Sequence, residues 1–276
     1  MKVQIKGLIR FSYPCEGGFN RTDWVSEDPR DTLYDPVRLE RRFAMFQALT
    51  LRTLALQKDA AFQIGVLIGN DFPASAREHL TYLLQQVPQA QIIALPPEVH
   101  YLATKQAFAR MPDDPEATHV ATFRLDDDDG MHRLTTQRIQ RLARALLQVR
   151  DPDAPFVISF NRGFYLNARG ARANVVERFE STPIGIGLSL VAPKGYADNI
   201  FRRNHRKLGQ YFDCYSEIER PMFIRSMHEA NDSGAKPTGQ AGALSRGEVI
   251  RTLKRGFGVT LKELKELAEA RQPDAA

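Results

Sequence analysis

The sequence has little cysteine and no long hydrophobic segment, and both absences narrow the class of protein. Its 276 residues include only Cys15 and Cys214, too few for a disulfide framework, so we expect a reducing compartment. No run of about eighteen uncharged apolar residues occurs, which argues against a membrane-spanning helix. The first residues, Met-Lys-Val-Gln-Ile-Lys, lack the apolar stretch of a secretory signal peptide. Together these features predict a cytoplasmic protein.

The composition is that of a globular chain with a mild positive charge. Hydrophobic residues make up 43% of the chain and charged residues 26%, which excludes collagen-like or mostly disordered behaviour. The net charge of +5 favours anionic partners such as nucleotides, phosphosugars or lipid head groups. Basic residues are widely spread, with one tight cluster at 202–207, and lack the single basic face of a typical nucleic-acid binder. We therefore expect no nucleic-acid partner.

Short apolar runs alternate with amphipathic segments along the first 160 residues. The runs predict strands at 3–11, 62–69, 91–95, 118–125 and 156–160, with weaker ones at 164–167, 184–192 and 221–227. Asp35-Pro36 predicts a helix start, and the tail 245–270 predicts a helix broken near Gly256 to Gly258. Such alternation indicates an α/β fold of three layers, a mainly parallel central sheet with helices on both faces.

Four consecutive aspartates, Asp126 to Asp129, follow the predicted strand 118–125. Open α/β sheets bind ligands at the carboxyl ends of their strands. Alternation along a strand would send Asp126 and Asp128 to one side, where two carboxylates suit Mg²⁺ or Mn²⁺. Such an ion can bridge the phosphates of a nucleotide. The alternative is a solvated acidic turn that caps a helix beginning near Leu134.

Two chemistries use carboxylates placed at the end of a strand. A phosphatase of the haloacid dehalogenase type would use Asp127 as nucleophile and Asp129 as acid, because residues 127–131 approach its Asp-x-Asp-Gly-Thr/Val motif. That motif lies in mid-chain here, and no later Gly-Asp-x-x-x-Asp element completes it. A glycosyltransferase of the GT-A type carries an Asp-x-Asp motif at the end of a central strand.

Several further segments favour the glycosyltransferase. They are Arg10-Phe11-Ser12, Leu49-Thr-Leu-Arg-Thr-Leu-Ala-Leu-Gln57, Thr122-Phe-Arg-Leu-Asp126-Asp127-Asp128-Asp129 and Pro221-Met222-Phe-Ile-Arg-Ser-Met-His228-Glu-Ala-Asn231. In their order and spacing they resemble the motifs of a bacterial family of rhamnosyltransferases, over most of residues 5–235. The chain departs from that pattern at Phe223, where the family has Trp, at Glu229, where it has Gly, and at Gly130-Met131.

The resemblance implies a single GT-A-like glycosyltransferase domain over residues 1–276. Its parts would be a nucleotide-sugar-binding half at 1–160, an acceptor-binding and metal-completing half at 161–235, and a helical tail at 245–271. The implied reaction is the metal-dependent transfer of a sugar, rhamnose by the family's name, from a nucleoside diphosphate donor. The acceptor would be a hydroxyl of a cell-surface glycan or glycolipid.

The resemblance also implies roles for individual residues. Asp126 and Asp127 would bind the substrate, with Asp126 facing the ribose. A Mn²⁺ or Mg²⁺ ion would be held by three ligands, Asp128, Asp129 and His228.

Two arginines and one glutamate are predicted from the residues themselves. Arg10 and Arg124 each lie near the end of an apolar strand, and we expect them to bind phosphate, because a guanidinium group matches phosphate geometry. An inverting reaction needs a general base, for which we choose Glu217, leaving Glu219 and Asp213 as alternatives.

A non-enzymatic alternative is a basic binding module in the tail. Its basic residues are Arg251, Lys254, Arg255, Lys262 and Lys265, but five acidic residues share the region. We expect at most a weak contact of this tail with the inner membrane surface. His205 lies within the basic cluster, which is expected on an exposed helix face, with contact to the sugar diphosphate or to an acidic acceptor as the alternative. The sequence gives no prediction of oligomeric state.

Overall fold

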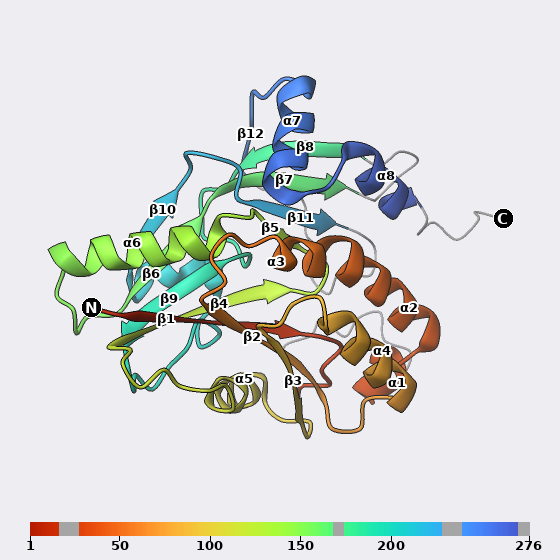
Figure 1. Ribbon diagram of the computed structural model, residues 1–276, viewed down its shortest axis with the longest axis horizontal. Coiled ribbons are helices and arrows are strands. Elements are labelled where there is room, and N and C mark those ends of the chain that lie inside the picture. Colours follow the sequence, from red (N-terminus) through yellow and green to blue (C-terminus); the bar gives the residue numbers. More distant parts are fainter. Residues whose placement is uncertain (17–27, 168–173, 228–238, 270–276) are drawn as a thin grey trace.

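A seven-stranded sheet forms the centre of the computed structural model, which describes residues 1–16, 28–167, 174–227 and 239–269 (Figure 1). The strand order is β10-β6-β9-β4-β1-β2-β3. The strands are β1 (Val3–Arg10), β2 (Phe62–Gly69), β3 (Ala90–Leu95), β4 (His119–Asp126), β6 (Phe156–Phe160), β9 (Leu188–Pro193) and β10 (Asp213–Glu217). Only β9 runs antiparallel to its neighbours within this sheet. The prediction of a mainly parallel central sheet is confirmed.

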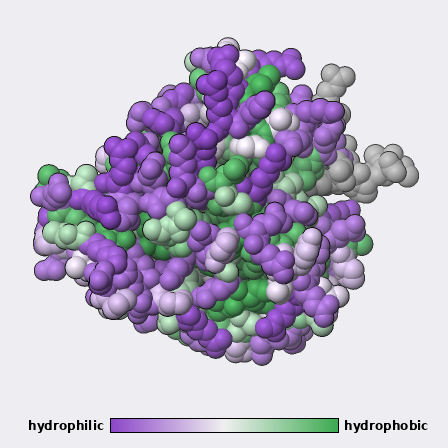
Figure 2. Space-filling view, viewed as in Figure 1, coloured by the Kyte–Doolittle hydropathy of each residue, from purple (hydrophilic) through white to green (hydrophobic). Residues whose placement is uncertain are grey.

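Helices cover both faces of this sheet, which makes three layers (Figure 1). One face packs against α2 (Pro36–Met45), α4 (Ala74–Leu84) and α6 (Thr135–Val149), and the other against α5 (His100–Ala109). Alternation along β1 supplies both sides, since Ile5 and Ile9 join the first cluster and Leu8 joins the second. Hydrophilic side chains cover most of the face in view, with hydrophobic ones between them (Figure 2).

A second sheet of five strands lies beside the first, in the order β12-β8-β7-β11-β5. Its strands are β5 (Gly130–Met131), β7 (Arg162–Asn167), β8 (Asn174–Phe179), β11 (Phe223–Met227) and β12 (Gln240–Ala241). The chain enters this sheet directly after the aspartates, because β5 begins at Gly130 and pairs with β11. The aspartates therefore occupy the junction between the two sheets.

The tail packs onto the second sheet. It consists of α7 (Arg246–Thr252), the π-helical segment η4 (Leu253–Phe257) and α8 (Leu261–Glu269). Leu253 and Phe257 share a hydrophobic cluster with Phe164 of β7. The predicted break falls at Gly258, whose φ of +68° suits glycine. The apolar side of the tail is therefore part of a hydrophobic cluster shared with the second sheet.

The sequence located the long elements and missed several short ones. Asp35 caps α2 as expected, its carboxylate accepting a 2.8 Å hydrogen bond from the backbone N–H of Arg38. The predicted strand 184–192 begins only at Leu188, after Gly187 with a φ of +67°. Four strands, β5, β8, β10 and β12, were not predicted. Within the described ranges, no helix is long and apolar enough to cross a membrane.

The close contact between β1 and β4 generates a prediction about stability. A Cβ atom at Gly7 would fall on the ring of Phe123, whereas one at Gly209 would meet nothing within 4 Å. Gly7→Ala should lower the free energy of unfolding by about 1–3 kcal/mol, because the packed core cannot accept the added carbon. Chemical denaturation should show that Gly209→Ala is close to neutral and that Gly7→Ala/Phe123→Leu recovers part of the loss. An unchanged stability of Gly7→Ala would contradict this packing.

Candidate active site

The four aspartates form a turn at the carboxyl end of β4. The strand ends at Asp126, and the backbone N–H of Asp129 donates a 3.3 Å hydrogen bond to the Asp126 carbonyl. The predicted alternation of side chains is therefore wrong, because the chain turns where a strand was expected to continue. The acidic cap is also wrong: Asp127, Asp128 and Asp129 are buried, and α6 begins after Leu134 without a side-chain cap.

A cavity of about 440 Å³ lies over this turn and is lined by all four aspartates. This volume is within the usual range of small-molecule sites. Its charged lining consists of five arginines and the four aspartates, namely Arg10, Arg38, Arg42, Arg124, Arg225 and Asp126 to Asp129. The cavity lies at the edge where the parallel strands β1 and β4 end, since Arg10 pairs in register with Asp126.

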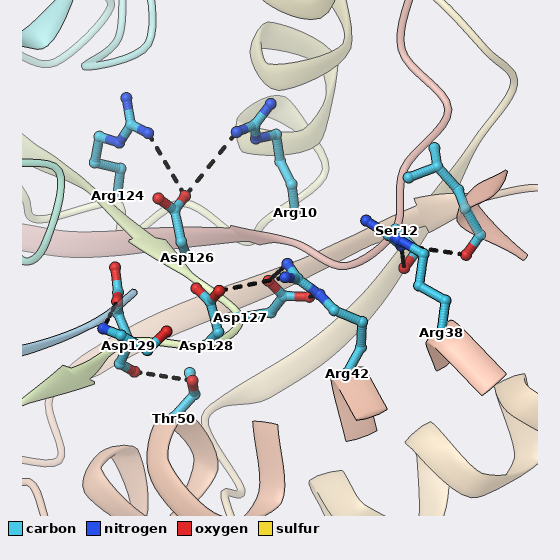
Figure 3. A network of polar contacts seen from close by, with 12 residues as sticks. Arg10, Ser12, Arg38, Arg42, Thr50, Arg124, Asp126, Asp127, Asp128 and Asp129 are labelled. Carbon is cyan, nitrogen blue, oxygen red and sulfur yellow. Dashed lines mark hydrogen bonds and ion pairs between the residues drawn. The ribbon is translucent and has the colours of Figure 1, made fainter. Parts of the chain in front are cut away.

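Asp126 lies between two arginines on one side of the cavity (Figure 3). One of its oxygens is 3.5 Å from a guanidinium nitrogen of Arg124 and 4.0 Å from one of Arg10. These separations are longer than those of a close ion pair. The Nε atoms of both arginines are buried and have no hydrogen-bond partner in the described part of the chain. The two guanidinium groups therefore keep capacity for an anion.

Arg42 of α2 reaches across to the other side of the turn (Figure 3). It donates hydrogen bonds to both carboxylate oxygens of Asp127, from Nε at 3.0 Å and from Nη2, and its Nη1 is 3.3 Å from Asp128. Burial, opposed by Arg42, raises the pKa of Asp127 to about 6, and Asp128 adds to the rise. Both oxygens of Asp127 are thus occupied by an arginine.

Asp129 has less positive charge near it than the other aspartates. Its Oδ1 accepts a 2.9 Å hydrogen bond from the backbone N–H of Ser226. Burial, followed by the charges of Asp128 and Asp126, raises its pKa well above the ordinary value, and Arg225 only partly opposes this. Negative charge is therefore least compensated at Asp129.

A divalent cation fits this part of the turn. Carboxylate oxygens are the ligands that Mg²⁺ and Mn²⁺ prefer, and a cation there would relieve the repulsion that raises the pKa of Asp129. Across the described ranges, no three His, Cys, Asp or Glu side chains are grouped as a metal site. The third predicted ligand, His228, lies outside the described residues; it follows directly after Met227, the last residue of β11.

One face of a helical segment holds the turn in place. The hydroxyl of Thr50 donates a 2.8 Å hydrogen bond to the Asp129 carbonyl, and that of Thr53 accepts one from the Met131 N–H. Thr50 lies in the π-helical segment η2 (Phe46–Leu51), which joins α2 to α3 (Arg52–Ala55). The wider π turn accommodates an extra residue, so that Arg42 and Thr50, eight positions apart, both reach the aspartates.

Two histidines also line the cavity, one of them in the basic cluster for which the sequence left a donor or acceptor contact open. They are His100 of α5 and His205 of the short 3₁₀ helix η3 (His205–Gln210). Burial, together with nearby arginines, lowers the pKa of each to about 3, so both are neutral at neutral pH. The expectation that His205 lies on an exposed helix face is wrong. Neutral imidazoles add hydrogen-bonding groups to the cavity without adding charge.

The structure does not bring Glu217 to the cavity. Its carboxylate is buried at the end of β10 and pairs with Arg138 of α6 at 2.7 Å. The alternatives are also bound elsewhere, Glu219 to Arg138 at 3.0 Å and Asp213 to Arg150 at 2.6 Å. In the described lining, every carboxylate comes from the aspartate turn. Nothing in this geometry supports a general base at Glu217.

Sequence reasoning also missed three of the five cavity arginines. Arg38 and Arg42 are four residues apart on α2, a spacing that places them on one helix face and could have indicated a shared role. Arg225 lies on β11 within the segment that resembles the family's last motif. Its approach to the aspartates depends on the pairing of β11 with β5, which no local pattern reveals.

The Arg42–Asp127 pair generates a prediction about stability and pH. Arg42→Ala should lower the free energy of unfolding by about 3–5 kcal/mol at pH 8, because it leaves a buried carboxylate without a counter-charge. The loss should shrink at pH 5, since the pKa of Asp127 is already raised and a protonated carboxyl needs no counter-charge. Arg42→Ala/Asp127→Asn should regain stability. Denaturation curves at both pH values test this, and an equal loss at pH 5 and pH 8 would rule it out.

A comparison with known protein families confirms the resemblance. The model of the family described as "Putative rhamnosyl transferase" matches residues 4–240. A search of curated proteins found no match. Among solved structures, S. aureus TarS 1–349 in complex with UDP-GlcNAc is 12% identical at a TM-score of 0.46, covering 86% of this chain and 62% of that one. The same protein in complex with UDP is 11% identical at 0.41, covering 82% and 61%.

The chain therefore spans less than two thirds of the length of the solved structures that it matches. The family match takes in well over half of this chain and includes every strand that surrounds the aspartate turn. The protein belongs to the rhamnosyl transferase family.

Proposed function

We propose that this protein is a metal-dependent glycosyltransferase that moves a sugar, rhamnose by the family's name, from a nucleoside diphosphate donor to a hydroxyl acceptor. The observation that carries the proposal is the cavity, which joins five arginines to a buried aspartate turn. Arginines match the charge of a diphosphate, and the carboxylates of the aspartate turn match a divalent cation. Family membership supports the same reaction class.

The donor would lie along the cavity with its phosphates near the arginines. Arg10 and Arg124 bind phosphate oxygens through their unpartnered N–H groups. Asp126, the most exposed of the four carboxylates, accepts hydrogen bonds from ribose hydroxyls. Asp127 acts indirectly, because both its oxygens hold Arg42 in place.

Mn²⁺ or Mg²⁺ would be held by Asp128, Asp129 and the predicted ligand His228. Bound there, the ion supplies positive charge where the leaving diphosphate develops negative charge. Asp129 keeps its carboxylate in place through the Ser226 N–H, and Thr50 fixes its backbone carbonyl. These contacts hold the aspartate turn in a fixed geometry before the ion binds.

The geometry gives less support to the phosphatase alternative. That reaction needs a free oxygen of Asp127 to attack phosphorus, yet Arg42 donates to both of its oxygens. The acceptor we propose is a hydroxyl of a cell-surface glycan or glycolipid, modified from the cytoplasmic side. The tail α7–α8 would make at most a weak contact with the membrane surface.

The first test is the dependence of ligand binding on a divalent ion. UDP, GDP and dTDP should be screened for thermal stabilisation with Mn²⁺ and with excess EDTA, followed by their sugar conjugates for hydrolysis and transfer. At about 100 times Kd a bound nucleotide should stabilise the fold by roughly 2–3 kcal/mol, with Mn²⁺ only. Equal stabilisation in EDTA would sink the metal-dependent mechanism.

A second test removes one charge from the aspartate turn. Asp128→Asn should abolish Mn²⁺-dependent nucleotide binding and sugar transfer while the protein stays folded, because the amide has nearly the shape of the carboxylate. Asp153→Asn, an exposed position outside the cavity, is the matched control. If Asp127→Asn instead abolished activity on a simple phosphomonoester, the phosphatase alternative would be favoured.

A third test concerns His228. Imidazole coordinates a metal only when neutral, so Mn²⁺ affinity should fall as the pH is lowered through the titration range of histidine. His228→Ala should weaken Mn²⁺ binding and leave the melting temperature of the metal-free protein unchanged. Unchanged Mn²⁺ affinity combined with a large loss of metal-free stability would identify His228 as a structural residue.

A further inference from the structure

Among the residues that the structure describes, Arg225 differs from Arg10, Arg42 and Arg124 of the cavity in having no carboxylate within ion-pair distance. Arg10 and Arg124 lie within 4.0 Å of Asp126, and Arg42 pairs with Asp127. Among the described residues, Arg225 makes no ion pair within that distance, although it lines the cavity. A half-buried guanidinium group has lost hydration, and without a close ion pair to a described carboxylate it is prepared for an anionic ligand.

A buried pair on the second sheet lies behind Arg225. Tyr165 of β7 is its neighbour in register across the parallel strands, so the two side chains leave the sheet on the same face. The guanidinium carbon of Arg225 is 5.7 Å from the centre of the Tyr165 ring. The Tyr165 hydroxyl donates a 2.5 Å hydrogen bond to Glu180, and both side chains are buried.

This pair can fix the direction of the guanidinium group. Because the Tyr165 hydroxyl donates its hydrogen bond to Glu180, the lone pairs of its oxygen remain to accept a hydrogen bond from Arg225. Burial and Glu180 raise the pKa of Tyr165 to about 12, so the phenol keeps its proton. Burial alone would lower the pKa of Arg225, but Asp129 and the Tyr165 hydroxyl outweigh it. Glu180 is itself anchored, since its backbone exchanges hydrogen bonds with Asn161 at 2.7 and 3.0 Å.

We propose that Arg225 binds the terminal phosphate of the nucleoside diphosphate, and that Tyr165 and Glu180 are positioning residues that hold its guanidinium group. This inference rests on the proposed function and adds the second sheet to the donor site. The placement follows from the cavity, which Arg225 lines together with Asp129, a proposed metal ligand. A guanidinium group beside that ligand contacts the phosphate on which negative charge develops as the diphosphate leaves.

The test compares three substitutions with one control. The variants are Arg225→Gln, Arg225→Lys and Tyr165→Phe, and the control is Tyr101→Phe. Tyr101 also donates to a carboxylate, that of Asp198 at 2.6 Å, but it lies outside the cavity. Affinities for inorganic pyrophosphate with Mg²⁺, and for UDP, GDP and dTDP, are measured below the melting temperature of every variant. Pyrophosphate carries the diphosphate without a base, so this probe does not depend on donor identity.

Arg225→Gln should weaken pyrophosphate binding roughly 10- to 100-fold, the usual value of a charge-assisted hydrogen bond, and Arg225→Lys should weaken it less. Tyr165→Phe should weaken it about 3- to 10-fold, and Tyr101→Phe should not change it. Mg²⁺ affinity without pyrophosphate should not fall in Arg225→Gln, because the substitution removes a positive charge that repels Mg²⁺ near Asp129. A merely structural role would instead lower Mg²⁺ affinity and melting temperature together.

The outcomes separate this inference from the proposed function. If the wild type binds none of these probes with a divalent ion, the proposed function fails and the inference fails with it. If the wild type binds them and Arg225→Gln binds them equally well, the inference is overturned while the function stands. Normal affinity in Tyr165→Phe, with only a lower melting temperature, would remove the positioning role of Tyr165 and Glu180.

Discussion

The aspartate turn depends on the ion pair between Arg42 and Asp127. Three of its four carboxylates are buried, and adjacent buried carboxylates repel one another unless positive charge lies nearby. Arg42 supplies that charge to Asp127 and, at 3.3 Å, to Asp128. Arg10 and Arg124 do the same for Asp126 at longer distance. The positive charge near Asp129 compensates its carboxylate only in part, so a divalent cation would be stabilised beside it.

The architecture explains how such a turn is held. β4 delivers the aspartates from the central sheet, β5 takes the chain into the second sheet, and β11 approaches with Ser226 and Arg225. On the remaining side, the helical segment from α2 to α3 fixes the turn through Arg42 and Thr50. Three parts of the fold therefore meet at one point, so that the site is formed before any ligand binds.

Charge balance connects this geometry to the proposed chemistry. Five arginines face four aspartates, and both cavity histidines are neutral, so the protein alone offers a diphosphate only a small positive excess. A divalent ion at Asp128 and Asp129 would enlarge that excess at the place where the leaving group gains charge. The same argument underlies the role proposed for Arg225, which lines the cavity and has no ion pair to a carboxylate among the described residues.

The sequence by itself determined the layers of the fold and the importance of the aspartate run. Periodicity located β1, β2, β4 and α2, because burial on one face repeats at fixed intervals along the chain.

Only the tertiary structure decided which partners the aspartates have. Arg42 lies 85 residues from Asp127 along the chain, and Arg225 lies 225 − 129 = 96 residues from Asp129. The packing of α2 and the pairing of β11 with β5 bring both arginines to the turn. Glu217 failed as a candidate base for the same reason. Its distance from the cavity follows from the order of strands in the sheet, which hydrogen bonding between remote segments sets and local sequence does not encode.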